Sequence, residues 1–420
     1  MTKTEGYENS ELFMSLTPKN GVKASKLYSY KPTNGNGDFV WARNLPAYRV
    51  NQSGVLELMG SDVPRIDYSN TCPELLIEKT ITNELLWSEK FDEFPEWLFD
   101  GVSLTSGITA PNNDTTAFKL VEDAFLMEHY YYQNFSYGGV ATVTFSVFAQ
   151  KDERDIIYLQ FLDAGGSPYI TWFDLTNGTV LTNNNTRADI KLINGYYRCE
   201  ITNTLDFNGG SSSATFGLAE NDGSKAYLGD GTSGANFWGS QLEENDYATS
   251  YIPTTTTAVT RPQDICYNTA NLFGDAAWSV VMRVRLNNIG SNTSEPLLAL
   301  NDGSTDNYFC IYTDSNPKLY FDWYNNPDQL TLDTSDLTNE IYNIGVSYDD
   351  STGDYIIVLN GNLEFTGNVG VSLAGAFTGS FLRMDLGSIV GTGSPDGDRI
   401  IGVQYYNTAL TQSDLENITS

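Results

Sequence analysis

The sequence predicts an all-β protein made of two consecutive β-sandwich domains. Gly and Asn are plentiful, and Tyr and Phe far outnumber Met, as is typical of strands joined by tight turns. No long segment shows 3.6-residue periodicity, whereas alternating runs of strand length recur along the chain. A length of 420 residues with 40% hydrophobic residues is sufficient for two or three domains with real cores.

Residues 1–75 are predicted to be a small N-terminal segment that attaches the chain to a partner. Short strands are expected on either side of a turn-rich stretch at 31–37, and a hairpin is expected over 49–58 with its turn at 52–54. A region this short, without its own core, usually packs on a neighbouring domain or on another subunit. We therefore predict an attachment or assembly role for it.

Residues 76–262 are predicted to form the first sandwich, a jelly roll, because strand-length runs alternate regularly with turns. Within Ala141–Gln150 apolar and polar residues alternate, so one face is buried and the other is solvated. The candidate strands are Leu85–Ser88, Val102–Ser106, Ala117–Val121, His129–Phe135, Ala141–Gln150, Ile156–Leu162, Tyr169–Leu175, Arg187–Leu192, Tyr196–Leu205, Ala214–Ala219 and Asn236–Leu242.

The stretch 236–264 is predicted to close this sandwich and to lead into the next domain. Phe237–Leu242 alternates as a strand and is expected to pair beside the opening strand that carries Trp87. After an acidic turn, Thr249–Pro253 is expected to seal the edge, and a stiff run rich in Pro and Thr follows. The domain boundary is therefore placed near Pro262.

Residues 263–420 are predicted to form the second sandwich. Ser413, which is followed by Asp414 and Glu416, is expected to cap a final helical turn. The candidate strands are Trp278–Leu286, Pro296–Leu300, Tyr308–Tyr312, Lys318–Trp323, Ile341–Tyr348 and Tyr355–Leu359.

The chain is strongly acidic, with 53 acidic and 23 basic residues and a formal net charge of −30. Such a field repels nucleic acid and anionic lipid, so neither is an expected partner. No apolar run reaches the length of about 18 residues that a membrane span needs, and the first residues carry no apolar secretory region. Cys199 and Cys310 lie in apolar runs, which favours buried free thiols over a disulfide framework.

Residues suited to catalysis are scarce, and we predict that the chain is not an enzyme. The single histidine, His129, lies among tyrosines on a predicted strand, where a structural role is favoured. Zinc hydrolases use two or three imidazoles, and phosphate-binding glycine motifs are absent. A glycoside hydrolase needs only two carboxylates, so a glycan-depolymerising activity stays an alternative, although no acid pair stands out.

Saccharide binding is the site hypothesis that the residues favour. A pyranose ring stacks on a flat aromatic side chain while its hydroxyl groups form hydrogen bonds with polar residues. The alternative is that the same aromatic residues lie in the core or in a subunit interface. The candidates are Tyr130, Tyr132, Tyr169 and Trp172 in the first sandwich and Tyr320, Trp323 and Tyr324 in the second.

Acidic turns in the second sandwich suggest a structural Ca²⁺ site, with an ordinary turn as the alternative. Ca²⁺ prefers carboxylate and carbonyl oxygens, but Asp and Asn are also common in turns for backbone reasons. None of these turns has EF-hand spacing, a further cluster at Asp396 to Asp398 included, and no cofactor is expected to be required. The candidate ligands are Asp302, Asp306, Asp349, Asp350 and Asp354.

A set of motifs in residues 40–265 resembles tailed-phage virion fibre proteins of the head-spike-fibre type. Two positions depart from the family pattern: Glu84 interrupts an apolar run, and Tyr196 stands where the family has Trp. The motifs are RVN at 49–51, VPRIDY at 63–68, CPELLIE at 72–78, TITNELLWSEKFDEFPEW at 80–97 and GSQLEENDYATSYIPT at 239–254.

The rest of the chain carries a second resemblance. The stretches 344–364 and 399–419 are similar to laminin-G/concanavalin-A-like domains, and the first sandwich is similar in fold to carbohydrate-binding modules. Together these resemblances imply a structural protein of the virion surface, a head fibre or a tail-associated fibre. Such a protein is assembled in the host cytoplasm, contacts other virion proteins through its N-terminal segment, forms a homotrimer and adheres to host-surface polysaccharide. The alternatives are a bacterial carbohydrate-binding adhesin, a glycan-depolymerising fibre enzyme and a structural component without a ligand.

Overall fold

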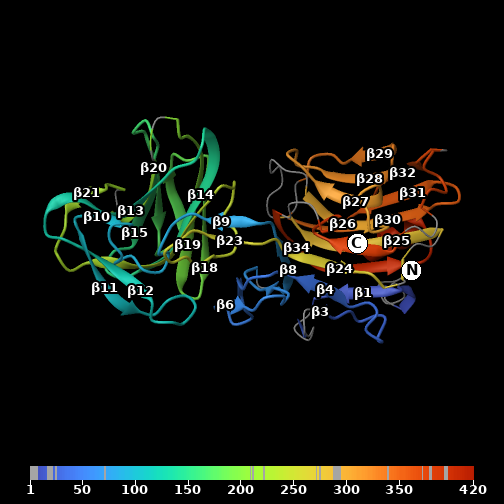
Figure 1. Ribbon diagram of the computed structural model, residues 1–420, viewed down its shortest axis with the longest axis horizontal. Coiled ribbons are helices and arrows are strands. Elements are labelled where there is room, and N and C mark those ends of the chain that lie inside the picture. The colour runs from blue at the N-terminus through green and yellow to red at the C-terminus, as the bar shows by residue number, and fades with distance from the viewer. Residues whose placement is uncertain are drawn as a thin grey trace. The chain divides into compact units, whose positions relative to one another are not determined.

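The computed structural model confirms the predicted all-β class, with strands throughout and the helix α2 (Gln412–Thr419) near the C-terminus (Figure 1). None of the helices within the described residues is long and apolar enough to cross a membrane. The structure describes residues 8–16, 22–23, 26–70, 72–208, 210, 212–220, 223–270, 272–273, 276–286, 295–337, 340–370, 372–377, 381–391 and 396–420.

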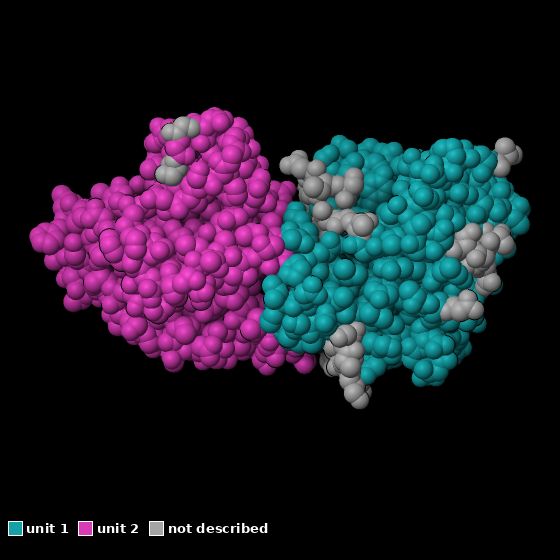
Figure 2. All heavy atoms as spheres, viewed as in Figure 1, with its two compact units in different colours: residues 1–46, 59–80, 262–420 teal, residues 47–58, 81–261 magenta. Residues whose placement is uncertain are grey.

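The chain forms two compact units, each built from segments that are separated in the sequence. Unit 1 contains residues 1–46, 59–80 and 262–420, and unit 2 contains residues 47–58 and 81–261 (Figure 2). This division differs from the predicted one, because residues 1–75 are shared between the two units. The predicted N-terminal segment is therefore not a separate structural part.

Unit 2 is a sandwich of two antiparallel sheets. Buried side chains from both sheets, among them Phe145, Phe161, Phe216 and Phe237, form one core. The six-stranded sheet has the order β11 (Val102–Ile108), β12 (Ala117–Glu122), β22 (Gly234–Glu243), β14 (Val140–Lys151), β19 (Tyr196–Asp206) and β18 (Arg187–Ile193). The second sheet has the order β10 (Leu98–Asp100), β13 (Leu126–Phe135), β20 (Ser212–Ala219), β15 (Ile156–Leu162), β16 (Pro168–Asp174) and β17 (Thr179–Asn183), and β21 (Ala226–Leu228) also pairs with β13.

The closing strand of unit 2 lies in a different place from the predicted one. β22 pairs with β12 and β14, and not with a strand that carries Trp87. Trp87 has a positive φ of 53° and lies in a turn. Two backbone hydrogen bonds still join this region to β22, from Glu84 N to Leu242 O (2.9 Å) and from Ser240 N to Ser88 O (3.0 Å).

Two short strand pairs complete unit 2. The predicted hairpin over 49–58 is confirmed as β5 (Ala47–Val50) and β6 (Leu56–Met59). Tyr48 of β5 packs on Trp238 and Tyr251, with ring centroids 6.5 and 5.6 Å apart. β9 (Ile81–Asn83) pairs with β23 (Val259–Arg261), so the chain enters and leaves the main part of unit 2 on neighbouring strands.

Unit 1 is a second sandwich, and N-terminal strands are part of both of its sheets. One sheet has the order β32 (Asn362–Asn368), β31 (Asp354–Leu359), β30 (Ile341–Asp349), β25 (Ala277–Arg285), β34 (Asp396–Tyr406), β8 (Glu74–Glu78) and β7 (Ile66–Asp67), and β1 (Leu12–Ser15) also pairs with β34. The other has the order β2 (Val22–Lys23), β3 (Lys26–Leu27), β4 (Phe39–Ala42), β24 (Ile265–Asn268), β33 (Arg383–Leu386), β26 (Glu295–Asn301), β27 (Asn307–Thr313), β28 (Leu319–Asn325) and β29 (Asp328–Asp333).

Helix α2 packs its apolar side against the first of these sheets. Leu415 and Ile418 cluster with Val281 and Val358. The N-cap is Thr411 and not the predicted Ser413, because the Thr411 hydroxyl accepts a hydrogen bond from the Asp414 backbone N–H and the Asp414 carboxylate accepts one from the Thr411 N–H.

A buried ionic network holds the N-terminal strands in unit 1. Arg43, Arg65, Glu78 and Asp264 are all buried. Arg43 Nη1 lies 3.0 Å from Asp264 Oδ1, Arg65 Nη1 lies 2.7 Å from Glu78 Oε2, and Arg65 also pairs with Asp264. Arg65 and Glu78 belong to the motifs at 63–68 and 72–78 that carry the fibre resemblance, so these two motifs have a structural explanation in this fold.

The four cysteines differ in exposure, and this predicts their reactivity. Cys72 is exposed, whereas Cys199, Cys266 and Cys310 are buried free thiols, as the sequence predicted for Cys199 and Cys310. Burial, together with nearby carboxylates, raises the pKa of the three buried thiols well above the usual range.

We therefore expect native protein to react rapidly with a disulfide reagent such as DTNB at one thiol per chain, and at all four after unfolding in guanidinium chloride. A Cys72→Ser variant should lose the rapid reaction. Rapid reaction of two or more thiols in the native protein would contradict the burial described above.

Candidate functional site

The outer side of the second sheet of unit 2 carries a cross-strand row of aromatic residues. Strand register places Tyr130 of β13, Gly217 of β20, Tyr158 of β15 and Trp172 of β16 opposite one another. Side chains alternate along a strand, so Tyr132 lies on the same side as Tyr130. We call Tyr130, Tyr132, Tyr158 and Trp172 the aromatic face.

The four rings of the aromatic face form a packed surface. Tyr130, Tyr132 and Trp172 are half-buried, whereas Tyr158 is fully buried. The ring centroids of Tyr130 and Tyr132 are 5.8 Å apart. Gly217 permits the close packing, because a Cβ there would lie 2.6 Å from the Tyr158 ring. Three partly exposed rings thus lie over the buried Tyr158 ring on the solvent side of the sheet.

Two hydrogen-bond donors of the aromatic face lack partners. The Tyr158 hydroxyl and Trp172 Nε1 are buried, and neither has a hydrogen-bond partner among the described residues. Burial, followed by the nearby Glu128 and Tyr130, raises the pKa of Tyr158 well above its usual value. Tyr158 therefore keeps its proton at neutral pH. Buried donors without partners are uncommon in folded proteins, and an ordered water or a ligand can supply the missing acceptors.

Polar residues border the aromatic face. Lys225 Nζ lies 5.4 Å from the centroid of the Tyr158 ring, donates a hydrogen bond to Gln160 Oε1 (2.9 Å) and pairs with Glu128 Oε2 (3.2 Å). Asp100 of β10 is exposed and lies opposite Tyr130. Burial raises the pKa of Tyr130, and the negative charges of Asp100 and Glu128 raise it further.

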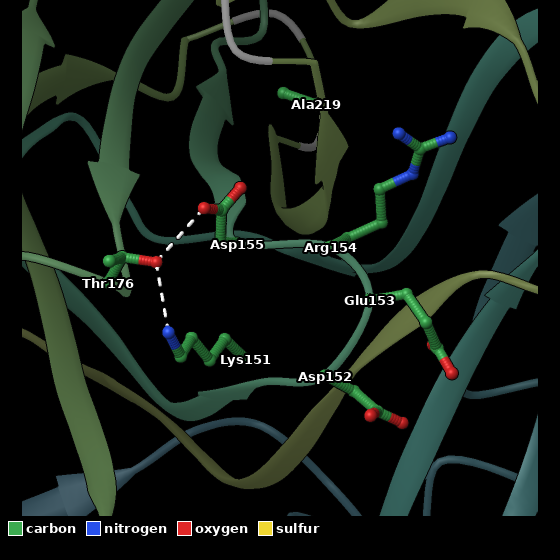
Figure 3. Close-up of a pocket in the computed structure, with 7 residues that line it drawn as sticks. All are labelled: Lys151, Asp152, Glu153, Arg154, Asp155, Thr176 and Ala219. Carbon is green, nitrogen blue, oxygen red and sulfur yellow. Dashed lines mark hydrogen bonds between the residues drawn. The ribbon is translucent and has the colours of Figure 1, made fainter.

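A polar pocket of about 290 Å³ opens near one end of this face (Figure 3). Ala219 belongs both to the pocket and to the apolar cluster under the aromatic face. Thr176 Oγ1 lies between two pocket residues, 3.2 Å from Lys151 Nζ and 3.0 Å from Asp155 Oδ2. The Arg154 side chain is held by Glu122 through hydrogen bonds of 2.7 and 2.6 Å. The other lining residues are Asp152 and Glu153.

The structure does not bring Tyr169 together with the other predicted residues of unit 2. Its strand partner is Phe161, and it packs against the core on the opposite side of the sheet from Trp172. His129 is buried as well, with Nδ1 2.7 Å from Gly101 O and Nε2 3.3 Å from Tyr227 O. Both contacts are to backbone carbonyls, which fits the predicted structural role.

In unit 1 the predicted residues of β28 separate onto two faces. Tyr320 and Tyr324 lie half-buried on the outer side, where they pack against Tyr312 (5.0 Å) and Tyr308 (5.2 Å) of β27. Trp323 is fully buried in the core. The prediction of a surface role is therefore wrong for Trp323, because neighbouring residues of a strand point to opposite faces.

The acidic residues proposed as Ca²⁺ ligands mostly form turns. Asp302 and Asp349 accept hydrogen bonds from the backbone of Ser304 and Ser351 two residues later, as Asx turns do. The remaining candidates are Asp306, which accepts from Asn326 (3.4 Å), Asp354, which accepts from Asn368 (2.8 Å), and Asp350, which is buried and accepts from Tyr348 (3.0 Å).

Within the described part of the chain, no group of three or more His, Cys, Asp or Glu side chains is arranged to hold a metal ion. The side chains of the further cluster at Asp396 and Asp398 lie outside the described residues.

Sequence reasoning missed three residues of the site. Tyr158 and Gln160 alternate with buried Ile157 and Leu159 in a strand that was predicted, so alternation alone could have placed them on the outer side. Lys225 follows β20 in a loop before β21, and no local pattern in the sequence links it to Gln160 or Glu128.

Comparisons with known proteins give a limited result. No protein-family model and no curated protein matches the chain. Among solved structures, the CBM40 of the Ruminococcus gnavus IT-sialidase is 20% identical, with 34% of this chain and 83% of that chain covered and a TM-score of 0.30.

Two further structures are similar to a comparable share of the chain. The NanB sialidase from Streptococcus pneumoniae is 15% identical, with 35% of this chain and 24% of that chain covered and a TM-score of 0.31. The binding domain of botulinum neurotoxin serotype G is 14% identical, with 37% and 39% covered and a TM-score of 0.30. We base the function on the residues of the aromatic face and not on these similarities.

Proposed function

We propose that this chain is a non-catalytic surface protein that binds glycans on the aromatic face of unit 2. The observation that carries the proposal is the row of Tyr130, Tyr158 and Trp172, in which partly exposed rings stand beside buried donors without partners. Saccharides have an apolar face that stacks on such rings and hydroxyl oxygens that accept hydrogen bonds from such donors.

The shape of the site suits a chain of sugars. Along a strand, side chains on one side repeat every second residue, which is about 7 Å. Tyr132, Tyr130 and the Ala219 end of the face therefore offer successive positions, and the polar pocket continues beyond them. Stacking on more than one ring would add the contributions of several weak contacts.

The proposed biological setting is the surface of a phage virion, where the protein would be a head fibre or a tail-associated fibre that decorates the particle as a homotrimer and adheres to host polysaccharide. The motifs in residues 40–265 support this setting. Residues 1–75, which are divided between the two units, would contact other virion proteins. Mass spectrometry and cryo-electron microscopy of purified particles would test it, and absence of the chain from particles would exclude it.

Replacement of Trp172 by alanine is expected to weaken glycan binding by about tenfold to a hundredfold, because a central aromatic contact is lost. Tyr130→Ala should have a similar effect. Isothermal titration calorimetry with the strongest ligand from a glycan array would measure both affinities. Phe125→Ala is the matched control, since Phe125 is 68% exposed in the same unit and lies off the aromatic face.

Unchanged affinity in both aromatic variants would contradict the proposed site. Tyr320→Ala, measured in the same series, shows whether the tyrosines of unit 1 contribute separately. Release of reducing sugars from host polysaccharide would overturn the non-catalytic part of the proposal.

A further inference from the structure

This inference rests on the proposed function. We infer that the aromatic face selects uncharged saccharides, and that Lys225, Gln160 and Glu128 form a polar triad that binds adjacent hydroxyl groups of a sugar ring. Two observations carry this inference. The triad is held in place beside the rings, and among the described residues the carboxylates around the face outnumber the cations.

The triad is pre-organised by its own contacts. Lys225 Nζ bridges Gln160 Oε1 at 2.9 Å and Glu128 Oε2 at 3.2 Å while it lies over the Tyr158 ring. The Lys225 side chain is 19% exposed and that of Glu128 is 40% exposed, so the triad is partly enclosed but reachable. An ammonium group that is fixed in this way loses little further entropy when it binds a ligand.

Each member of the triad keeps hydrogen-bonding capacity. An ammonium group has three donors, and two are used by Gln160 and Glu128. The Gln160 amide nitrogen makes no hydrogen bond recorded among the described residues, and the Glu128 carboxylate has two oxygens with several acceptor positions. A donor and an acceptor side by side match two adjacent hydroxyl groups, each of which both donates and accepts.

The charge around the aromatic face is negative. Glu128 neutralises Lys225, and Asp100 adds a second carboxylate beside Tyr130. The raised pKa of Tyr130 agrees with this placement, since burial and then these two carboxylates are its causes. A carboxylate or sulfate on the ligand would therefore meet an excess of negative charge at the rim.

The charges of the pocket beyond Ala219 do not make the surroundings of the aromatic face positive. Its three carboxylates, Asp152, Glu153 and Asp155, outnumber the two cations that line it, and Lys119 pairs with Asp152 (2.8 Å) and Glu153 (2.5 Å) from outside the lining. One of those cations, Arg154, is engaged by Glu122 at 2.6 Å. The chain as a whole carries a net charge of −30, so the long-range field acts in the same direction.

The test uses the full chain on an array that pairs each neutral glycan with its sialylated, uronic-acid or sulfated derivative, at low and at high salt. We expect the strongest ligands to be neutral, and their acidic partners to bind roughly tenfold more weakly at low salt. This difference should shrink at high salt, because screening weakens the repulsion.

Two variants locate the effect. Lys225→Met should weaken binding of the best neutral glycan about tenfold, because the remaining ammonium donor is lost and Gln160 and Glu128 lose the group that holds them in place. Glu128→Gln keeps the size of the side chain and removes its charge. This variant should therefore reduce the difference in affinity between each neutral glycan and its acidic derivative. Lys318→Met is the control, since Lys318 pairs with Asp333 in unit 1 at 2.6 Å.

The outcomes separate the two proposals. Strongest binding of acidic glycans, with affinity that falls as salt rises, would overturn the selection for uncharged saccharides and leave glycan binding intact. Binding that is insensitive to Lys225→Met would overturn the role of the triad. Absence of binding to any glycan would overturn the proposed function itself.

Discussion

Replacement of Asp264 by alanine is expected to lower the free energy of unfolding of unit 1 by about 3–5 kcal/mol, the usual cost of breaking a buried ion pair. Asp264 accepts from Arg43 Nη1 (3.0 Å), from the Glu78 backbone N–H (3.0 Å) and from Arg65, and both arginines are fully buried. Without the carboxylate, two guanidinium groups would share the single charge of Glu78. Urea unfolding followed by hydrogen-exchange mass spectrometry would measure the change in peptides of each unit.

Asp333→Ala is the matched control for this variant. Asp333 pairs with Lys318 at 2.6 Å, but the two side chains are 49% and 30% exposed, so the expected loss is below about 1 kcal/mol. If Asp264→Ala fails to fold, Asp264→Asn keeps the shape and still removes the charge. Equal stability losses for Asp264 and Asp333 variants would show that the buried network does not hold the N-terminal strands.

Replacement of Glu89 by glutamine is expected to stabilise unit 2 at pH 8 by about 2–3 kcal/mol and to have little effect at pH 4. Burial raises the pKa of Glu89 to about 7. A hydrogen bond from Tyr251 lowers this pKa, whereas the negative charge of Asp114 raises it further. Glu89 Oε1 is buried without a hydrogen-bond partner among the described residues. The charged form is therefore costly in the folded state.

The pH dependence follows from the direction of the Glu89 shift. Between the ordinary pKa of about 4.5 and the folded value of about 7, the folded state holds a proton that the unfolded state releases. Stability attributable to Glu89 thus falls as pH rises through this window, and the variant should lose that slope. Thermal unfolding from pH 4 to pH 8 measures it, with Glu244→Gln as the control at an exposed glutamate of the same unit. A parallel pH profile for wild type and Glu89→Gln would contradict the assigned environment.

The sequence allowed the fold class and many strands to be predicted because strand patterns are local. The alternation within Ala141–Gln150 needs no distant information, and the structure has β14 at Val140–Lys151. The same alternation separates Tyr320 and Tyr324 from the buried Trp323, although their clustering in sequence suggested a single surface. Burial depends on which face meets the other sheet, and only the register between strands decides that.

The parts that could not be predicted depend on contacts between distant residues. The aromatic face exists because Tyr130, Tyr158 and Trp172 fall into one row, with Gly217 between the first two. The N-terminal strands have partners far along the chain. Phe39–Ala42 pairs with Ile265–Asn268, and Leu12–Ser15 pairs with the last strand. No periodicity in residues 1–75 could reveal partners at such a distance.

The segmented order of the two units has a consequence for biosynthesis. Ribosomes release residues 81–261 before residues 262–420, so unit 2 can close its sheets while most of unit 1 has yet to be made. During that interval β1 and β8 lack β34 and β4 lacks β24, so these edges are open to other chains. Nascent chains that stop early would thus carry a folded unit 2 beside unpaired strands that can associate with other chains. Translation speed across the last 160 or so codons would then influence how much of the protein escapes aggregation.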